Sequence, residues 1–200
     1  MYFDFDKNMN KKLLSILIRN CENVNCNVRA IVFDMGNKTL LKELGVNSKK
    51  LCYSFENPTD SARSVYIFPD VPHSVKNMKN HTLDNGMVIK HDDGSLIHIT
   101  KALYARLLAC DGVDFRLCHK VTPHHLQMTG MERRRVRQAM EFFSNSVAQA
   151  LIQLFSNRFV QQARVIEIID SWIDVMNSRT PTDGKINRCG LGISFVISTF

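Results

Sequence analysis

The sequence has no run of apolar residues long enough to cross a membrane, which takes about 18 in succession. Its first residues, MYFDFDKNMNKK, are too acidic and too polar for a secretory signal peptide. Six cysteines occur without the regular spacing of a disulfide framework, as expected in a reducing compartment. These absences predict an intracellular protein with no membrane partner.

Two familiar site motifs are missing as well. No GxxxxGK[ST] phosphate loop occurs, because Gly184 and Lys185 lack both the upstream glycine and the Ser or Thr that should follow. A nucleotide site here must therefore be of another design. One cluster has zinc-type side chains but no CxxC pair to complete a tetrahedral set, so ordinary loop and helix-start residues are the favoured interpretation. Its members are Cys118, His119, His124 and His125.

Positive charge is what the chain has in excess. Two hundred residues with 44% hydrophobic content suffice for one domain or two small ones, and the net charge is +7. Such a charge favours polyanionic partners, among them nucleic acids and nucleotide phosphates. The densest run, ERRRVR from Glu132 to Arg137, is equally typical of a phosphate-binding surface and of the solvated face of a helix.

The first 85 residues predict an α/β domain. Short apolar runs at Val28 to Asp34 and Val65 to Phe68 are typical of strands covered on both faces. Helical patterns precede, separate and follow them, so we expect a parallel sheet. The three predicted helices are Asn10 to Cys21, Lys38 to Glu43, and one from His73 with Val75 and Met78 inward and Lys76 and Lys79 outward.

The character changes after Asp84-Asn85-Gly86. Residues 86–187 predict a second, mostly helical domain, which opens with a short hairpin around Asp93-Gly94. Its longest helix carries an apolar residue every three or four positions, which indicates a persistent inward face. Residues 188–200 form an apolar tail, and we expect the chain to be a fragment. The predicted hairpin spans Val88 to His98, and the helices span Leu103 to Leu108, Arg133 to Phe155 and Gln162 to Met176.

Two acids stand at predicted strand ends, Asp34 and Asp70. Sites in parallel sheets form at the carboxyl ends of strands, so the two carboxylates are placed to share a divalent cation such as Mg²⁺. The alternative is that each aspartate caps the helix that follows it, and spacing alone favours the cap.

Three polar residues share one face of the last predicted helix. Asp170, Asp174 and Asn177 are spaced by four and three residues. A carboxylate accepts two hydrogen bonds from a guanine edge, and an amide both donates and accepts. Without further information, a solvated surface face explains the same pattern better.

Several stretches resemble the transposases of P elements and their host-domesticated relatives, in order from about Tyr2 to Asn187. DVPHSVKNMKN and FFSNSVAQAL are the more specific of them, and AIVFDMGNKTLLKELGV and SWIDVMNSR also match. The resemblance implies an RNase H-like catalytic domain interrupted by a helical GTP-binding insertion domain. It further implies action on DNA in the nucleus, with Mg²⁺ and GTP as cofactors.

The resemblance also implies residue roles. Asp34 corresponds to the second catalytic, metal-binding aspartate, and Asp70 borders the same site. Guanine recognition falls on the D-x-x-N of WIDVMNS, which gives Asp174 and Asn177. We expect phosphate contacts from the basic helices. These candidates are Lys76, Lys79, Arg133, Arg134 and Arg137.

Departures from the family pattern limit the expected activity. The first catalytic aspartate should precede MYFDF and the final glutamate should follow Phe200, so this polypeptide alone is not expected to cut or join DNA. An alternative from another class is a domesticated, non-enzymatic module that holds DNA or a protein. A third interpretation is an unrelated α/β domain whose Asp34 binds Mg²⁺ as a phosphate acceptor, but it leaves the helical second half unexplained.

Overall fold

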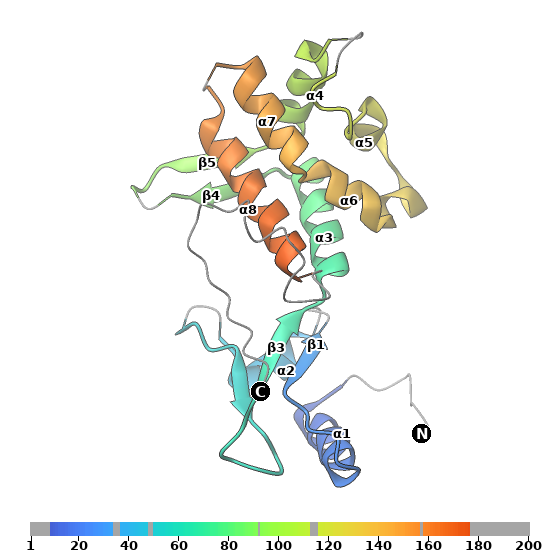
Figure 1. Cartoon of the computed structure of the whole chain (residues 1–200), viewed down its shortest axis with the longest axis vertical. Helices are drawn as coiled ribbons and strands as arrows, with labels where there is room; N and C mark the ends of the chain where they lie inside the picture. Colours follow the sequence, from blue (N-terminus) through green and yellow to red (C-terminus); the bar gives the residue numbers. More distant parts are fainter. Residues whose placement is uncertain are drawn as a thin grey trace. The chain divides into compact units, whose positions relative to one another are not determined.

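The computed structural model describes residues 9–33, 37–47, 50–91, 93–112, 116–156 and 158–176. Its contacts divide the chain into two compact units, residues 1–70 and 71–200, which are considered separately (Figure 1). Within the described residues, every helix is too short or too polar to span a membrane.

The first unit is a small mixed sheet with two helices. Strands β1 (Ala30–Phe33) and β3 (Ser64–Pro69) are parallel neighbours, with Phe33 opposite Pro69. Helix α2 (Lys38–Glu43) lies between them in sequence, as predicted. A third strand, β2 (Ser54–Glu56), pairs antiparallel with β3, so the predicted parallel pairing holds for β1 and β3 while the sheet as a whole is mixed. The sheet order is β1-β3-β2.

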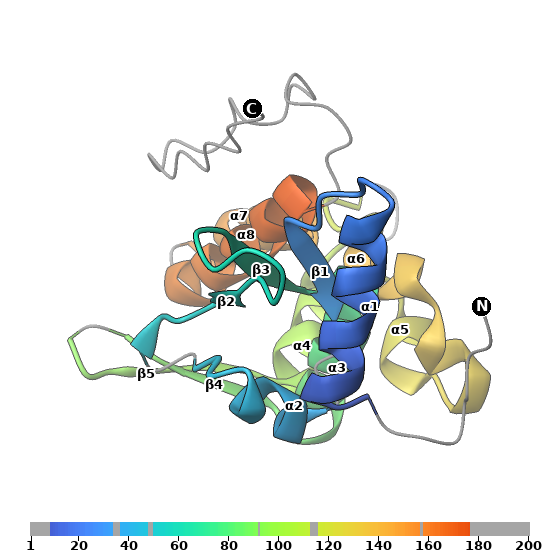
Figure 2. The same cartoon turned by 90° about the horizontal axis from the view of Figure 1, so that it is seen from below.

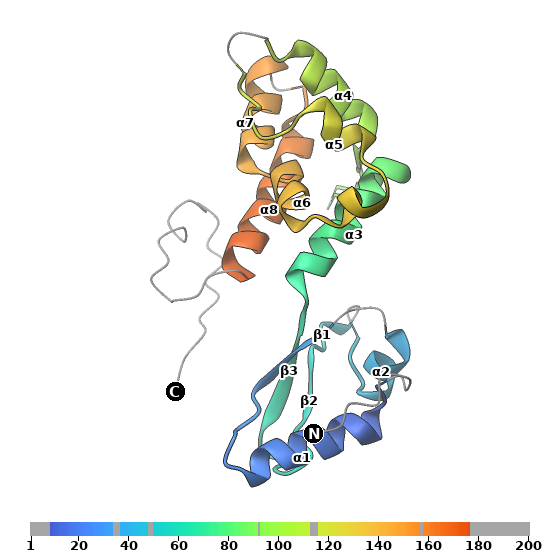
Figure 3. The ribbon, with the colours of Figure 1, turned by 90° about the vertical axis from the view of Figure 1, so that its right-hand side faces the viewer.

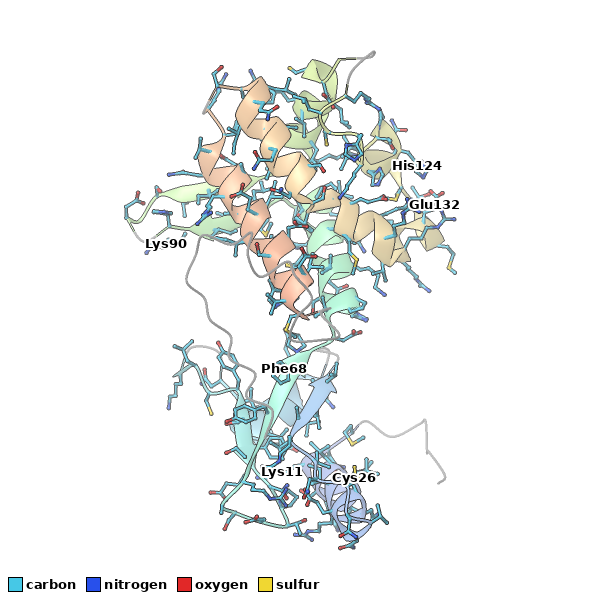
Figure 4. The ribbon with its side chains drawn as sticks, viewed as in Figure 1. Lys11, Cys26, Phe68, Lys90, His124 and Glu132 are labelled. Atoms are coloured by element: carbon cyan, nitrogen blue, oxygen red, sulfur yellow. The ribbon has the colours of Figure 1, made fainter. Side chains whose placement is uncertain are left out.

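One face of this sheet is covered by helices. Helix α1 (Lys11–Asn23) begins at Asn10, whose side-chain oxygen accepts a hydrogen bond from the Leu13 amide at 2.9 Å. Leu14 and Ile18 of α1 are buried in a core cluster that also includes Ile67 of β3, and α1 runs beside the strands in Figure 2. The opposite strand positions stay open to solvent, since Val32 is 72% exposed and Phe68, labelled in Figure 4, is 41% exposed.

The second unit is a helical bundle with one hairpin. The hairpin, β4 (Met87–Lys90) and β5 (Leu96–Ile99), covers the predicted span and extends one residue beyond it at each end. Helix α4 spans Lys101–Cys110, and α8, the last helix among the described residues, spans Val160–Met176, close to their predicted limits. Helix α3 (Val71–Asp84) packs with this unit, whereas the division between domains was predicted after residue 85. The reason is that Val71 and Val75 are buried in the core of the second unit.

The predicted helix from Arg133 to Phe155 was wrong as a single element. It is divided into η2 (Gly130–Arg134), α6 (Val136–Phe142) and α7 (Asn145–Leu154), and a short helix α5 (Pro123–Gln127) precedes it. Figure 3 shows α6 and α7 as separate helices, of which α7 packs against α8 and α6 against α3. The break between them puts a helix start at Ser144, which a continuous helix would not have provided.

The core of the second unit contains closely packed aromatic rings. Tyr104 of α4 stacks on Phe142 with ring centroids 3.8 Å apart, and Phe142 meets Phe143 edge to face. The Tyr104 hydroxyl donates to the Phe142 carbonyl at 3.1 Å. Burial raises the pKa of Tyr104 well above its ordinary value, so this hydroxyl stays protonated and remains a donor.

Candidate functional site

Helices α7 and α8 form an antiparallel pair that brings two polar groups close together. The Gln149 amide of α7 donates to the Glu167 carboxylate of α8 at 2.9 Å, which fixes the register of the pair (Figure 1). Ser144 lies five residues before Gln149, and Trp172 lies five residues after Glu167. The start of α7 is therefore level with Trp172, within one helical turn of Asp174.

Ser144 is a buried hydroxyl at this helix start. It is 3% exposed, and within the described residues its Oγ has no hydrogen-bond partner. Its backbone is extended, and its carbonyl accepts from the Val147 amide at 2.9 Å, so it occupies the N-cap position without making the usual side-chain cap. A buried hydroxyl without a partner costs about 1–3 kcal/mol. The positive end of the α7 dipole at this position favours a nearby polar or anionic group.

Asp174 of α8 lies within one helical turn of the level of this helix start. It lies one turn after Asp170 on α8 and is half-buried, while its neighbour Ile173 belongs to the core. The family resemblance implied that Asp174 and Asn177 bind guanine, and Asn177 lies outside the described residues. Ser144 was missed, although a serine directly before an apolar helical pattern is a recognised start signal.

Lys79 does not occupy the surface position that the sequence pattern predicted. Its side chain is fully buried, and its ammonium donates to the Arg133 carbonyl at 3.2 Å. Burial, together with the nearby Arg133 charge, lowers the pKa of Lys79. The outward orientation predicted for Lys79 was therefore wrong, and in this structure its ammonium is not accessible to a phosphate. Lys76, one turn earlier on α3, is half-exposed.

The arginines of the ERRRVR run differ in their surroundings. Arg133 donates to Asp84 at 2.6 Å and to the Asn80 carbonyl at 3.3 Å, which ties η2 to the end of α3. Arg137 is 89% exposed at its side chain but contacts Glu141 at 2.8 Å. Arg134 is exposed. Only part of this run is therefore available to an external anion.

Asp70 lies at the carboxyl end of the parallel strand pair. Its amide donates to the Phe33 carbonyl at 3.0 Å, which aligns the ends of β1 and β3. Asp34 follows Phe33 directly in sequence but lies outside the described residues. Within the described part of the chain, no three His, Cys, Asp or Glu side chains are grouped closely enough to hold a metal ion. Asp70 by itself does not form a Mg²⁺ site.

The cysteine and histidines of the zinc-type cluster make separate contacts. Cys118 is buried, which raises the pKa of its thiol to about 11 and keeps it protonated. His125 contacts the Thr122 hydroxyl at 3.1 Å and Glu141 at 3.2 Å. His124 meets Glu132 at 3.4 Å, and these two face each other in Figure 4.

Three comparisons relate the chain to known proteins. A family model described as TNP-like, GTP-binding insertion domain matches residues 72–189. The chain is 27% identical over 193 residues to the transposable element P transposase of Drosophila melanogaster, covering 93% of this chain and 25% of that protein. The solved Drosophila P element transposase strand transfer complex matches with a TM-score of 0.78 and 27% identity, over 92% of this chain and 42% of the other. The predicted resemblance is confirmed, and the chain spans about a quarter of its curated relative.

Proposed function

The chain belongs to the family defined by the TNP-like, GTP-binding insertion domain, and from this membership we propose that its second unit binds GTP where α7 begins beside α8. The observation that carries the proposal is the buried hydroxyl of Ser144, which has no hydrogen-bond partner among the described residues and stands at the start of α7, level along the helix pair with Trp172 of α8. Asp174 accepts the two guanine N–H groups, with Asn177 as the second base contact, and Ser144 contacts a polar group of the nucleotide.

The larger role follows from the relatives. The chain is a segment of a P-element-type transposase and acts on DNA in the nucleus, with the GTP-binding unit as one part of that machinery. Asp34 and Asp70 are the proposed acids of the catalytic face, supported by the alignment of Phe33 with Pro69 at the ends of two parallel strands. The described residues at this face do not by themselves form a metal site.

Exchanging the acceptor at residue 174 tests the base contact. Asp174→Asn replaces a carboxylate oxygen, which accepts, by an amide group that donates, so it should weaken the binding of GTP. It should strengthen the binding of xanthosine triphosphate, because the base xanthine carries a carbonyl where guanine has its amino group. A lost hydrogen bond to a charged group is worth about 1.5–3 kcal/mol, or about 10- to 150-fold in GTP affinity. Calorimetry on the whole 200-residue chain with GTP, ATP and xanthosine triphosphate measures the exchange.

Glu167→Gln is the matched control, because Glu167 is an acid on the same helix, about two turns away, that contacts Gln149 and Arg164. It should leave GTP affinity unchanged. Ser144→Ala separates a ligand contact from a packing role. It should stabilise the nucleotide-free chain, because a buried unpaired hydroxyl is removed, and it should lower the affinity for GTP. Equal GTP affinity in wild type and Asp174→Asn would refute the base contact, and a wild-type chain that binds no GTP would refute the site.

A further inference from the structure

Two arginines in the second unit lie against a pair of phenylalanine rings. The Arg106 guanidinium of α4 is 5.6 Å from the Phe155 ring centroid and 5.8 Å from that of Phe159. Arg158 lies 5.7 Å from the Phe159 centroid, and the two rings meet edge to face. We refer to Arg106, Phe155, Arg158 and Phe159 as the arginine-phenylalanine patch. It lies where α4 meets the turn between α7 and α8, far along α7 from Ser144 (Figure 3).

The geometry of the patch holds its cations in place. The Arg158 amide donates to the Phe155 carbonyl at 2.9 Å and closes the turn that carries it. Both arginines are exposed and both rings are half-buried, so the rings anchor the guanidinium groups at the surface. An arginine held in this way loses less conformational freedom on binding than an unsupported one.

Negative charge is scarce around these cations. Helix α4 contains no Asp or Glu, and neither does the sequence from Phe142 to Ile166. After α4, the Asp111 carboxylate accepts from the amides of Leu117 and Cys118 at 2.8 and 2.9 Å. Among the described residues, neither Arg106 nor Arg158 takes part in an ion pair. Two arginine side chains that are held in place without a carboxylate partner favour the binding of an external anion.

The geometry points to a new contact surface: we propose that the arginine-phenylalanine patch binds the phosphodiester backbone of duplex DNA without regard to sequence. Guanidinium groups resting on rings keep N–H donors for phosphate oxygens, while the rings they cover are less open to stacking with bases. The proposal rests on DNA being the partner under the proposed function. It places that contact on α4 and the α7–α8 turn rather than on the ERRRVR run, where Arg137 already meets Glu141.

The test compares pairs of arginine substitutions by fluorescence anisotropy with a labelled random-sequence duplex over a series of salt concentrations. The double variant R106Q/R158Q should lower affinity about tenfold at 0.1 M salt and reduce the slope of log K against log salt by about 1.8. R19Q/R29Q is the matched control, because it removes the same charge from exposed positions of the first unit. Phe159→Leu keeps both charges but removes their support, and should weaken binding by a smaller factor.

Each outcome decides the proposal. A larger loss for R106Q/R158Q than for R19Q/R29Q supports the patch, and equal losses would overturn it, because total charge alone would then explain binding. Absence of wild-type binding would also overturn it, as would polyglutamate competing as well as DNA, or single-stranded DNA binding more tightly than duplex. GTP titrations on the same variants separate the proposals, since retained GTP binding with no DNA binding removes the patch alone.

Discussion

Replacing Lys79 with methionine is expected to stabilise the second unit. The lysine is fully buried on α3, and within the described residues its ammonium has one recorded hydrogen bond, to the Arg133 carbonyl at 3.2 Å. Burying an ammonium costs several kcal/mol, and a single hydrogen bond to a charged group offsets about 1.5–3 kcal/mol. Methionine fills a similar volume without charge, so the net gain should be about 1–3 kcal/mol.

The pH dependence of stability provides a second test of Lys79→Met. Burial lowers the pKa of Lys79 below its ordinary 10.5, so between the two values the unfolded chain binds a proton that the folded chain does not. Wild-type stability should therefore rise with pH through this window. The advantage of Lys79→Met should be largest near neutral pH and shrink as the pH approaches 10.5.

Urea unfolding followed by tryptophan fluorescence measures this prediction. The chain has one tryptophan, Trp172, which packs against the core of the second unit, so the signal reports on that unit. Lys76→Met makes the same exchange at a half-exposed position of α3 and should change stability by less than about 0.5 kcal/mol. If Lys79→Met loses more than about 1 kcal/mol at neutral pH with an unchanged urea slope, the buried ammonium is a net stabiliser and the reasoning is refuted.

Two further changes have expected outcomes of their own. Tyr104→Phe removes the hydrogen bond to the Phe142 carbonyl but keeps the stacked rings, so the same unfolding assay should show a loss of about 1–2 kcal/mol; no loss would mean that the hydroxyl is not stabilising. Hydrogen bonding to Arg63 lowers the pKa of Glu22 to about 2, so its contribution is complete above its ordinary pKa of 4.5 and is lost as the pH falls from there toward 2. Glu22→Gln should flatten this part of the acid unfolding curve of the first unit, followed by circular dichroism, and an unchanged curve would contradict the assignment.

The sequence was informative wherever local patterns and packing agreed. The apolar runs of β1 and β3 and the helix between them were predicted from β-branched and apolar residue types, but the expectation that both faces of these strands are covered was wrong, since Val32 and Phe68 are exposed. Strand β2 was not, since Ser54–Glu56 is short and follows no alternating pattern. Its pairing depends on β3 being present, which is a tertiary effect that propensity does not contain.

Lys79 shows a different kind of error, in which the residue type outweighed the spacing. Val71, Val75 and Lys79 follow one another at intervals of four along α3, so the helical period itself placed Lys79 on the buried face. A lysine is rarely fully buried, and that preference led to the opposite prediction. The carbonyl that accepts its ammonium comes from Arg133, 54 residues later, so no local pattern could have revealed it.

The two proposed surfaces of the second unit lie toward opposite ends of one helix pair. Ser144 stands at the start of α7 and Phe155 at its end, and ten helical residues span about 15 Å. A nucleotide at the Ser144 end is therefore separated by the length of α7 from phosphates at the arginine-phenylalanine patch. If GTP changes DNA affinity at the patch, the effect must pass through the packing of α7 on α8, because binding free energies couple only through states that both ligands distinguish. By reciprocity, DNA would then change GTP affinity by the same factor. Gln149→Ala removes the hydrogen bond to Glu167 that fixes the register of α7 and α8. This variant should therefore change the coupling factor more than it changes the affinity for GTP alone or for DNA alone.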